Sequence, residues 1–275
     1  MLDSFDFKEP RCSLCDGKSF YNPQLNLPDG RIPTGRIIEK LASFFDKNDL
    51  DGARRFLEYW KQEAKELKDK KGELEMESEL IGLYRKLNLK EEGLQSAERA
   101  LSLVYELEQN KTVTGATIIL NSATNFKAFG RLEKALPLYQ ETLNVYLEKL
   151  DDNDSLLAGF YNNYALALTE NKEYQKAKDC FNKAISILEK ENPFNPDIAV
   201  SLVNLAHTEY EDSKDKNLIT DLLFKAMEVL TSEQTKKDSY LAFVLSKCAP
   251  SFEFFGFKKL ADDFVKTSKE LYERA

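Results

Sequence analysis

Residues 173–184 read EYQKAKDCFNKA, with small or aromatic side chains at Ala177, Phe181 and Ala184. The spacings of four and three place these residues on one face of a helix. The same three slots recur at steps of 42 residues in both directions. The other copies are Gly93, Ala97 and Ala100; Ala135, Tyr139 and Thr142; Ile219, Leu223 and Ala226; and Ala261, Val265 and Ser268. Five copies in one frame indicate stacked similar units, each needing its neighbour to bury its apolar face.

Each repeat reads as two antiparallel helices joined by a short polar turn. In the fourth repeat, Asp154-Ser155 caps a helix with one apolar stripe, and Glu170-Asn171-Lys172 forms the turn before the second helix. Asn195-Pro196 ends that repeat, because a residue before proline avoids the helical region. The pattern predicts six pairs, at about 34–68, 71–109, 112–150, 154–191, 196–232 and 236–274.

Two irregularities interrupt the frame. The second-helix slots of the first pair stand 40 rather than 42 residues before the next set, and Ala206 stands one residue early in the fifth pair. Residues 1–33 differ from the array, since prolines and glycines at their density oppose a long helix. We therefore expect an irregular extension over 1–33 and one continuous array over 34–275.

Composition limits the partners and the compartment. The 275 residues carry a net charge of −8, which argues against nucleic acid as the main partner. No apolar run is long enough to predict a membrane span, and no secretory signal is visible at the start. Four cysteines without such a signal suggest free thiols in a reducing compartment, so we expect a cytoplasmic protein.

The helix pairs resemble the tetratricopeptide repeat, which has small residues near positions 8, 20 and 27 and an aromatic residue near 24. The fourth pair matches these positions with Ala165, Ala177, Phe181 and Ala184. The long period and the segment 195–206, NPDIAVSLVNLA, look like the repeats of kinesin light chain. The resemblance covers about residues 34–275 and implies an all-α fold, a right-handed superhelical solenoid of about six antiparallel helix pairs. It does not name a function, since this scaffold serves many roles.

The first helices of such a solenoid line a concave groove, and position 6 points into it. Here position 6 is occupied by Glu79, Asn121, Asn163, Asn204 and Lys247. An amide offers a donor and an acceptor, which suits the backbone of an extended peptide. The alternative is that the asparagines bond to neighbouring helices. Further groove positions are Arg85, Leu120, Thr124, Lys127, Asn162, Leu166, Val203, His207 and Tyr210.

Two lysines of the predicted groove, Lys127 and Lys247, could favour an acidic ligand or a C-terminal carboxylate. The groove lacks the several basic residues of the carboxylate clamp that this repeat family uses, so solvated surface charge is the simpler interpretation.

Cys12 and Cys15 have the spacing of half a zinc site or of a redox pair. The remaining candidates, Cys180, Cys248 and His207, are scattered over three pairs. One chain is therefore not expected to complete a metal site, but two chains could share a zinc ion through Cys12 and Cys15 of each. No special role, metal binding and thiol–disulfide switching all stay open.

His207 is the only histidine, and no hydrolase elbow, phosphate-binding loop or zinc-protease motif accompanies it. We expect no enzyme and no cofactor. The run Phe254-Phe255-Gly256-Phe257 lies in the turn of the last pair, where it either packs as a cap or offers a surface for self-association.

Three functions follow as hypotheses. The first is a non-enzymatic interaction scaffold that binds a peptide or protein segment in its groove. The second is an intracellular peptide-sensing regulator, although residues 1–33 are too short and proline-rich for the usual effector domain. The third is a homodimeric adaptor linked by zinc or by thiols at Cys12 and Cys15.

Overall fold

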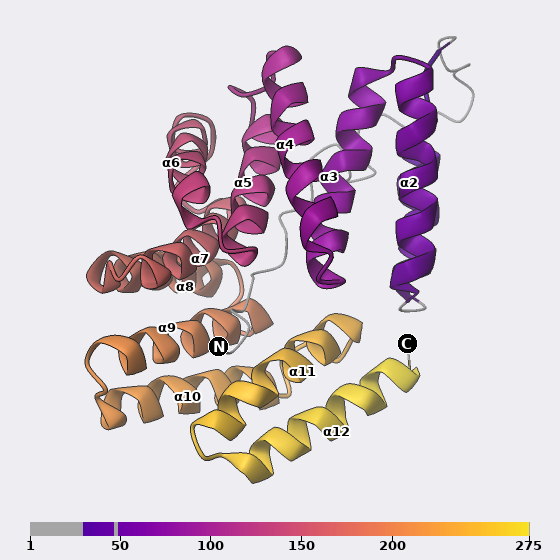
Figure 1. The fold of residues 1–275 in the computed structure, drawn as a ribbon. Helices are drawn as coiled ribbons and strands as arrows, with labels where there is room; N and C mark the ends of the chain where they lie inside the picture. Colours follow the sequence, from indigo (N-terminus) through magenta and orange to yellow (C-terminus); the bar gives the residue numbers. More distant parts are fainter. Residues whose placement is uncertain (1–29, 47–48, 275) are drawn as a thin grey trace. The chain divides into compact units, whose positions relative to one another are not determined.

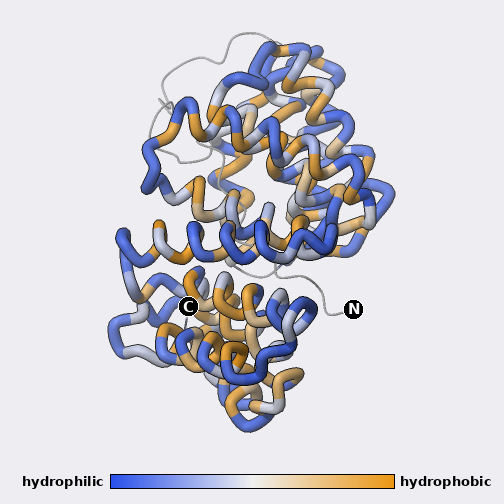
Figure 2. Tube along the Cα trace, turned by 90° about the vertical axis from the view of Figure 1, so that its left-hand side faces the viewer, coloured by the Kyte–Doolittle hydropathy of each residue, from blue (hydrophilic) through white to orange (hydrophobic). Residues whose placement is uncertain are grey.

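The structure, a computed structural model, describes residues 30–46 and 49–274. This part of the chain folds into twelve helices and contains no strand, as the sequence predicts (Figure 1). None of the helices described there is long and apolar enough to cross a membrane. Hydrophobic and hydrophilic residues alternate along most helices, so each has one side suited to burial (Figure 2).

The helices form two compact units, which divide between Leu150 and Asp151. The first unit contains α1 (Thr34–Asp46), α2 (Leu50–Glu66), α3 (Lys70–Lys86), α4 (Lys90–Glu106), α5 (Val113–Ala128) and α6 (Leu132–Lys149). The second contains α7 (Ser155–Glu170), α8 (Tyr174–Glu191), α9 (Pro196–Asp212), α10 (Lys216–Thr231), α11 (Ser239–Phe254) and α12 (Lys258–Arg274). The sequence does not predict this division, because the 42-residue frame runs through it.

The turns inside the pairs show the same period as the helices. A residue with positive φ ends the first helix of five successive pairs, at Asn88, Gly130, Lys172, Lys214 and Gly256. In four of these turns the next residue donates its N–H to a carbonyl five positions earlier. These bonds are Leu89 to Tyr84, Arg131 to Phe126, Glu173 to Leu168, and Phe257 to Phe252. This is the Schellman arrangement, which satisfies the last carbonyls of a helix.

Side chains cap the starts of several helices, including the one that the sequence predicts at Asp154. Asp154 accepts a hydrogen bond from the N–H of Leu156 at 2.8 Å, and Asn195 accepts one from Asp197 at 3.0 Å. Pro196 occupies the first turn of α9, where its missing N–H costs no helical bond. Pro137 lies inside α6, which continues unbroken to Lys149.

Small residues at the repeat positions allow the helices of a pair to pack closely. Ala123 and Ala135 in one pair, and Ala165 and Ala177 in another, have no exposed surface, and the aromatic ring of Phe181 is equally buried. First helices also contact one another, α3 with α5 in the first unit and α9 with α7 and α11 in the second. Within each unit the first helices therefore form a common layer.

Candidate functional site

We call the side of the first helices that carries the predicted groove residues the groove face. In the first unit it includes Arg85 on α3 with Asn121 and Lys127 on α5. In the second unit its residues are Asn162, Asn163 and Leu166 on α7, Asn204 and His207 on α9, and Lys247 on α11.

The asparagines of the second unit include a pair that is bonded within the chain. Asn204 Nδ2 donates to Asn162 Oδ1 at 3.2 Å, and Ser201 Oγ donates to the same oxygen at 3.3 Å. The Nδ2 atom of Asn162 is buried and has no hydrogen-bond partner in the part of the chain that the structure describes. Asn163 is buried beside it. For Asn162 and Asn204, the structure thus shows the contact between neighbouring helices that the sequence left as an alternative.

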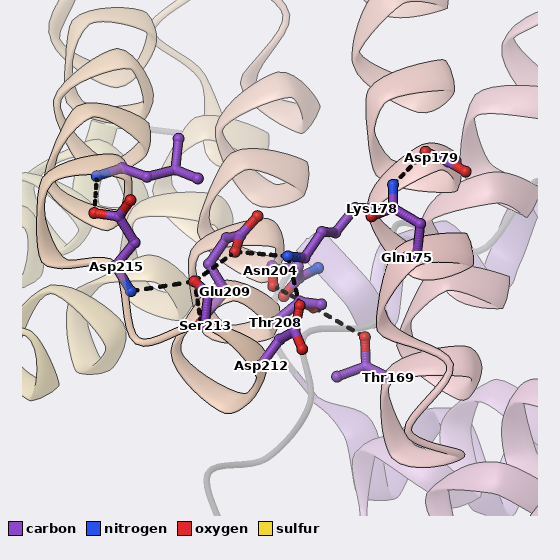
Figure 3. Close-up of polar contacts among 11 residues, drawn as sticks. Thr169, Gln175, Lys178, Asp179, Asn204, Thr208, Glu209, Asp212, Ser213 and Asp215 are labelled. Carbon is purple, nitrogen blue, oxygen red and sulfur yellow. Dashed lines mark hydrogen bonds and ion pairs between the residues drawn. The ribbon is translucent and has the colours of Figure 1, made fainter.

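A second row of polar contacts joins α7, α8 and α9 beside this pair (Figure 3). The hydroxyls of Thr169 and Thr208 lie 2.9 Å apart, and Thr208 also donates to the carbonyl of Asn204. Lys178 Nζ lies 2.7 Å from carboxylate oxygens of both Glu209 and Asp212. These bonds fix α8 and α9 in one register.

Burial opposes the charge of Lys178, but hydrogen bonds with Asp212 and Glu209 and their negative charges outweigh it and raise its pKa. Glu209 is itself buried. Lys178 is paired with both carboxylates, and the packing of α8 against α9 explains the network. Sequence reasoning missed it, because a lysine on a second helix reads as ordinary surface.

His207 lies in a cluster of aromatic rings rather than in an open groove. Its ring centroid is 4.8 Å from that of Phe255 and 5.5 Å from that of Phe254, and Tyr210 packs edge-on against both phenylalanines. Nε2 of His207 lies 2.9 Å from Ser251 Oγ. Burial lowers the pKa of His207 to about 4, so the ring is neutral at pH 7. Tyr210 and Phe254 remain 40% and 45% exposed.

Two further predicted groove residues of the second unit lie outside the asparagine pair and the ring cluster. Leu166 is half-buried on α7. Lys247 is exposed on α11, with its ammonium group 5.9 Å from the ring centroid of Phe243. Phe254-Phe255-Gly256-Phe257 forms the α11–α12 turn, where the ring of Phe257 packs against Phe252 and Phe224. Packing as a cap explains Phe257, while Phe254 still presents apolar surface.

In the first unit, the groove face of α5 is buried along its length. Asn121 is 6% exposed and Lys127 is 3% exposed. Thr124 is held by the hydroxyl of Tyr139 at 3.1 Å, whereas Asn121 makes no hydrogen bond with the residues that the structure describes. Arg85 is half-buried on α3. Burial raises the pKa of Glu75, on the same side of α3, to about 7, and its hydrogen bond with Thr34 partly opposes this rise.

An ion cluster between α2, α3 and α4 was not predicted. Glu73 and Glu77 are buried; Arg99 binds Glu73 through two bonds of 2.8 Å, and Ser96 donates to Glu77. Burial would raise the pKa of Glu73, but Arg99 and Lys65 outweigh it and lower the value. The residue 42 positions after Glu77 is the apolar Ile119. A carboxylate at a position that is apolar in the next repeat was the sequence feature that could have predicted this cluster.

Cys12 and Cys15 lie outside the described residues. Within the described ranges, no group of three or more His, Cys, Asp or Glu side chains is placed to hold a metal ion. Cys180 and Cys248 are free thiols. Burial raises the pKa of Cys180 to about 11 and that of Cys248 further, so both are protonated at pH 7 and weakly reactive.

Comparisons with known proteins identify the fold. No protein-family model matches the sequence, and no curated protein matches it. Solved structures do match. The apo form of RapI has a TM-score of 0.58 at 17% identity, covering 88% of this chain and 98% of RapI. A putative kinesin light chain of Podosopora anserina with TPR-like repeats scores 0.53 at 14% identity, covering 73% and 95% of the two chains. BtubC of P. vanneervenii scores 0.53 at 17% identity, covering 86% and 91%.

Proposed function

The chain is a repeat protein of the tetratricopeptide-like fold, and from this fold we propose that it works as a non-enzymatic scaffold that binds a peptide or protein segment on its groove face. Asparagine side chains would hold the main chain of an extended ligand. No cofactor is required. We place the protein in the cytoplasm, with a protein rather than a nucleic acid or a membrane as its partner.

The amide of Asn121 is the observation that carries this proposal. It is 6% exposed and makes no hydrogen bond with the described residues. The Asn121 amide atoms are not cut off from solvent in the described part of the chain, so a ligand backbone that supplies a donor and an acceptor would replace water there. Asn204 differs, because it is already bonded to Asn162. We therefore place the main contact at Asn121.

The surroundings of His207 support the non-enzymatic part of the proposal. Its partner Ser251 is buried, and no carboxylate bonds to the ring in the described part of the chain. A histidine with a pKa of about 4 is a weak base for activating a hydroxyl at pH 7. The Ser–His contact is therefore better explained as packing.

Affinity capture with a matched pair of variants tests the proposed function. The tagged protein, its Asn121→Ala variant and its Asn144→Ala variant are used as baits, and captured proteins are compared by mass spectrometry. Asn144 is an exposed asparagine on α6, the second helix of its pair. Asn144→Ala therefore removes the same side chain as Asn121→Ala, but at a position away from the groove face. We expect one set of proteins to be lost with Asn121→Ala and kept with Asn144→Ala. If the folded variants capture the same proteins, the groove face is not the binding site.

A further inference from the structure

Two hydrogen bonds hold the start of α1 to the start of α3. The N–H of Ile32, just before α1, donates to Asp69 Oδ2 at 3.1 Å, and the side chain of Thr34 bonds to the carboxyl group of Glu75. The Ile32 side chain also packs so closely that a Cβ on Gly72 would lie 2.6 Å from it. Residues 32–34 are thus fixed on the first two turns of α3.

The rest of α1 is held mainly by apolar packing. Ile37 and Leu41 are buried in the core that α1 shares with α2 and α3, and the ring centroid of Phe44 lies 5.4 Å from that of Phe56 on α2. α1 has 13 residues, whereas α2 has 17 and α6 has 18. With less apolar surface to bury, α1 depends more on the contacts at its start than a longer helix would.

The carboxyl group of Glu75 lies beneath α1 among negative charges. Asp69 in the α2–α3 turn and Glu79, one turn further along α3, repel a charge on it, and Lys71 offsets them only in part. Arg36 in the first turn of α1 is exposed, so solvent screens its charge. Burial first, and then the two neighbouring carboxylates, raise the pKa of Glu75 to about 7.

The cations of the other helices around α3 are placed elsewhere. Lys65 on α2 and Arg99 on α4 pair with Glu73. Two residues turn an α-helix by about 200°, so Glu73 and Glu75 leave α3 on nearly opposite sides. α5 carries one charged residue, Lys127, in its last turn, whereas Glu75 lies in the second turn of α3. A charged Glu75 would therefore be poorly compensated under α1.

This arrangement links the docking of α1 to the proton on Glu75. The ordinary pKa of a glutamate is 4.5, and the value with α1 docked is about 7. The docked state thus binds the proton more strongly, so its advantage is full below pH 4.5 and is lost as the pH rises through 7. When release of α1 returns the carboxyl group to water, these two values make the docking constant about tenfold lower at pH 8 than at pH 6.

We propose that Glu75 is a pH-sensitive lock on α1: loss of its proton raises the population in which residues 32–46 are released from α2 and α3. Release uncovers the apolar side chains of Ile37 and Leu41. The lock responds around neutral pH and acts at one end of the first unit. It involves no groove ligand, so its test is independent of the proposed function.

Hydrogen exchange in the full chain tests the lock. Amide protection is measured by mass spectrometry at pH 6 and pH 8, with labelling times scaled to the intrinsic exchange rate. The natural protein is compared with Glu75→Gln, which keeps the size of the side chain but cannot ionise. Glu39 is exposed on α1, so Glu39→Gln makes the same chemical change away from the lock.

We expect the protection of residues 37–45 to be about tenfold lower at pH 8 than at pH 6 in the natural protein and in Glu39→Gln. In Glu75→Gln it should be the same at both pH values, and the amides of α6 should keep their protection in all three proteins. Equal protection of α1 at the two pH values in the natural protein would overturn the lock. A tenfold loss that persists in Glu75→Gln, or a loss in α6 as large as that in α1, would also overturn it.

Discussion

The neutral ring of His207 contacts the hydroxyl of Ser251 and packs against Phe254 and Phe255. This buried environment makes the stability of the protein depend on pH. The unfolded chain has an ordinary histidine pKa of about 6.5, whereas burial lowers the folded value to about 4. A lowered histidine pKa means that the unfolded state binds the proton more strongly. Stability is therefore full above pH 6.5 and is lost as the pH falls toward 4.

The first prediction follows from this shift. Between pH 7 and pH 5, His207 should reduce the free energy of unfolding by about 2 kcal/mol. Urea denaturation at the two pH values, for the natural protein and for His207→Gln, measures the difference. Carboxylates titrate in both proteins, so their contribution to the pH dependence of the free energy of unfolding is the same in both and cancels. Equal pH dependence of the two proteins would show that the ring is not desolvated.

The second prediction concerns Lys178, whose loss would leave the buried Glu209 carboxylate without its main cation. Lys178→Met should destabilise the protein by about 2 kcal/mol in chemical denaturation. Lys176→Met is the matched control, because Lys176 pairs with Glu173 at the surface and should change the stability little. Similar effects of the two changes would mean that the network in Figure 3 is only a surface ion pair.

At the scale of elements, the turn that ends each first helix gives a test of the repeat itself. Lys172 adopts φ +62° at the slot where Gly130 adopts φ +74°, and a side chain at Gly130 would meet open space. Only the left-handed backbone then decides the effect of a substitution. Lys172→Gly should stabilise by about 1 kcal/mol, and Gly130→Ala should destabilise by a similar amount. Thermal unfolding of both variants checks the opposite signs, and a shared sign would contradict the proposed equivalence.

The sequence predicted the six helix pairs, the cap at Asp154 and the turn at Glu170-Asn171-Lys172, because each depends on residues close in the chain. It did not predict which asparagines meet. The position-6 assignment, shifted by one residue at Ala206, aligns Asn163 with Asn204, yet the bond joins Asn204 to Asn162, one full step of 42 residues away. Adjacent residues point about 100° apart around a helix, so a small rotation of α9 against α7 changes the partner. Packing between helices sets that rotation, and a periodic pattern does not encode it.

At the scale of the whole molecule, two hypotheses for assembly differ in their dependence on Cys12 and Cys15. The groove-binding account requires only one chain, whereas the zinc- or thiol-linked dimer requires these cysteines from two chains. We expect light scattering to give the mass of one chain, with or without a chelator and a reductant, and Cys12→Ser/Cys15→Ser to leave it unchanged. A dimer mass that falls on chelation or reduction would favour the linked dimer.

The binding affinity of the partner segment recovered by affinity capture is the most direct test of the central claim, that the groove face at Asn121 holds a ligand backbone. Calorimetric titration of that segment into the natural protein, Asn121→Ala and Asn144→Ala gives the comparison. The account predicts a loss of about tenfold in Kd for Asn121→Ala, which corresponds to about 1.4 kcal/mol, and no change for Asn144→Ala. An unchanged Kd for a folded Asn121→Ala protein would contradict it.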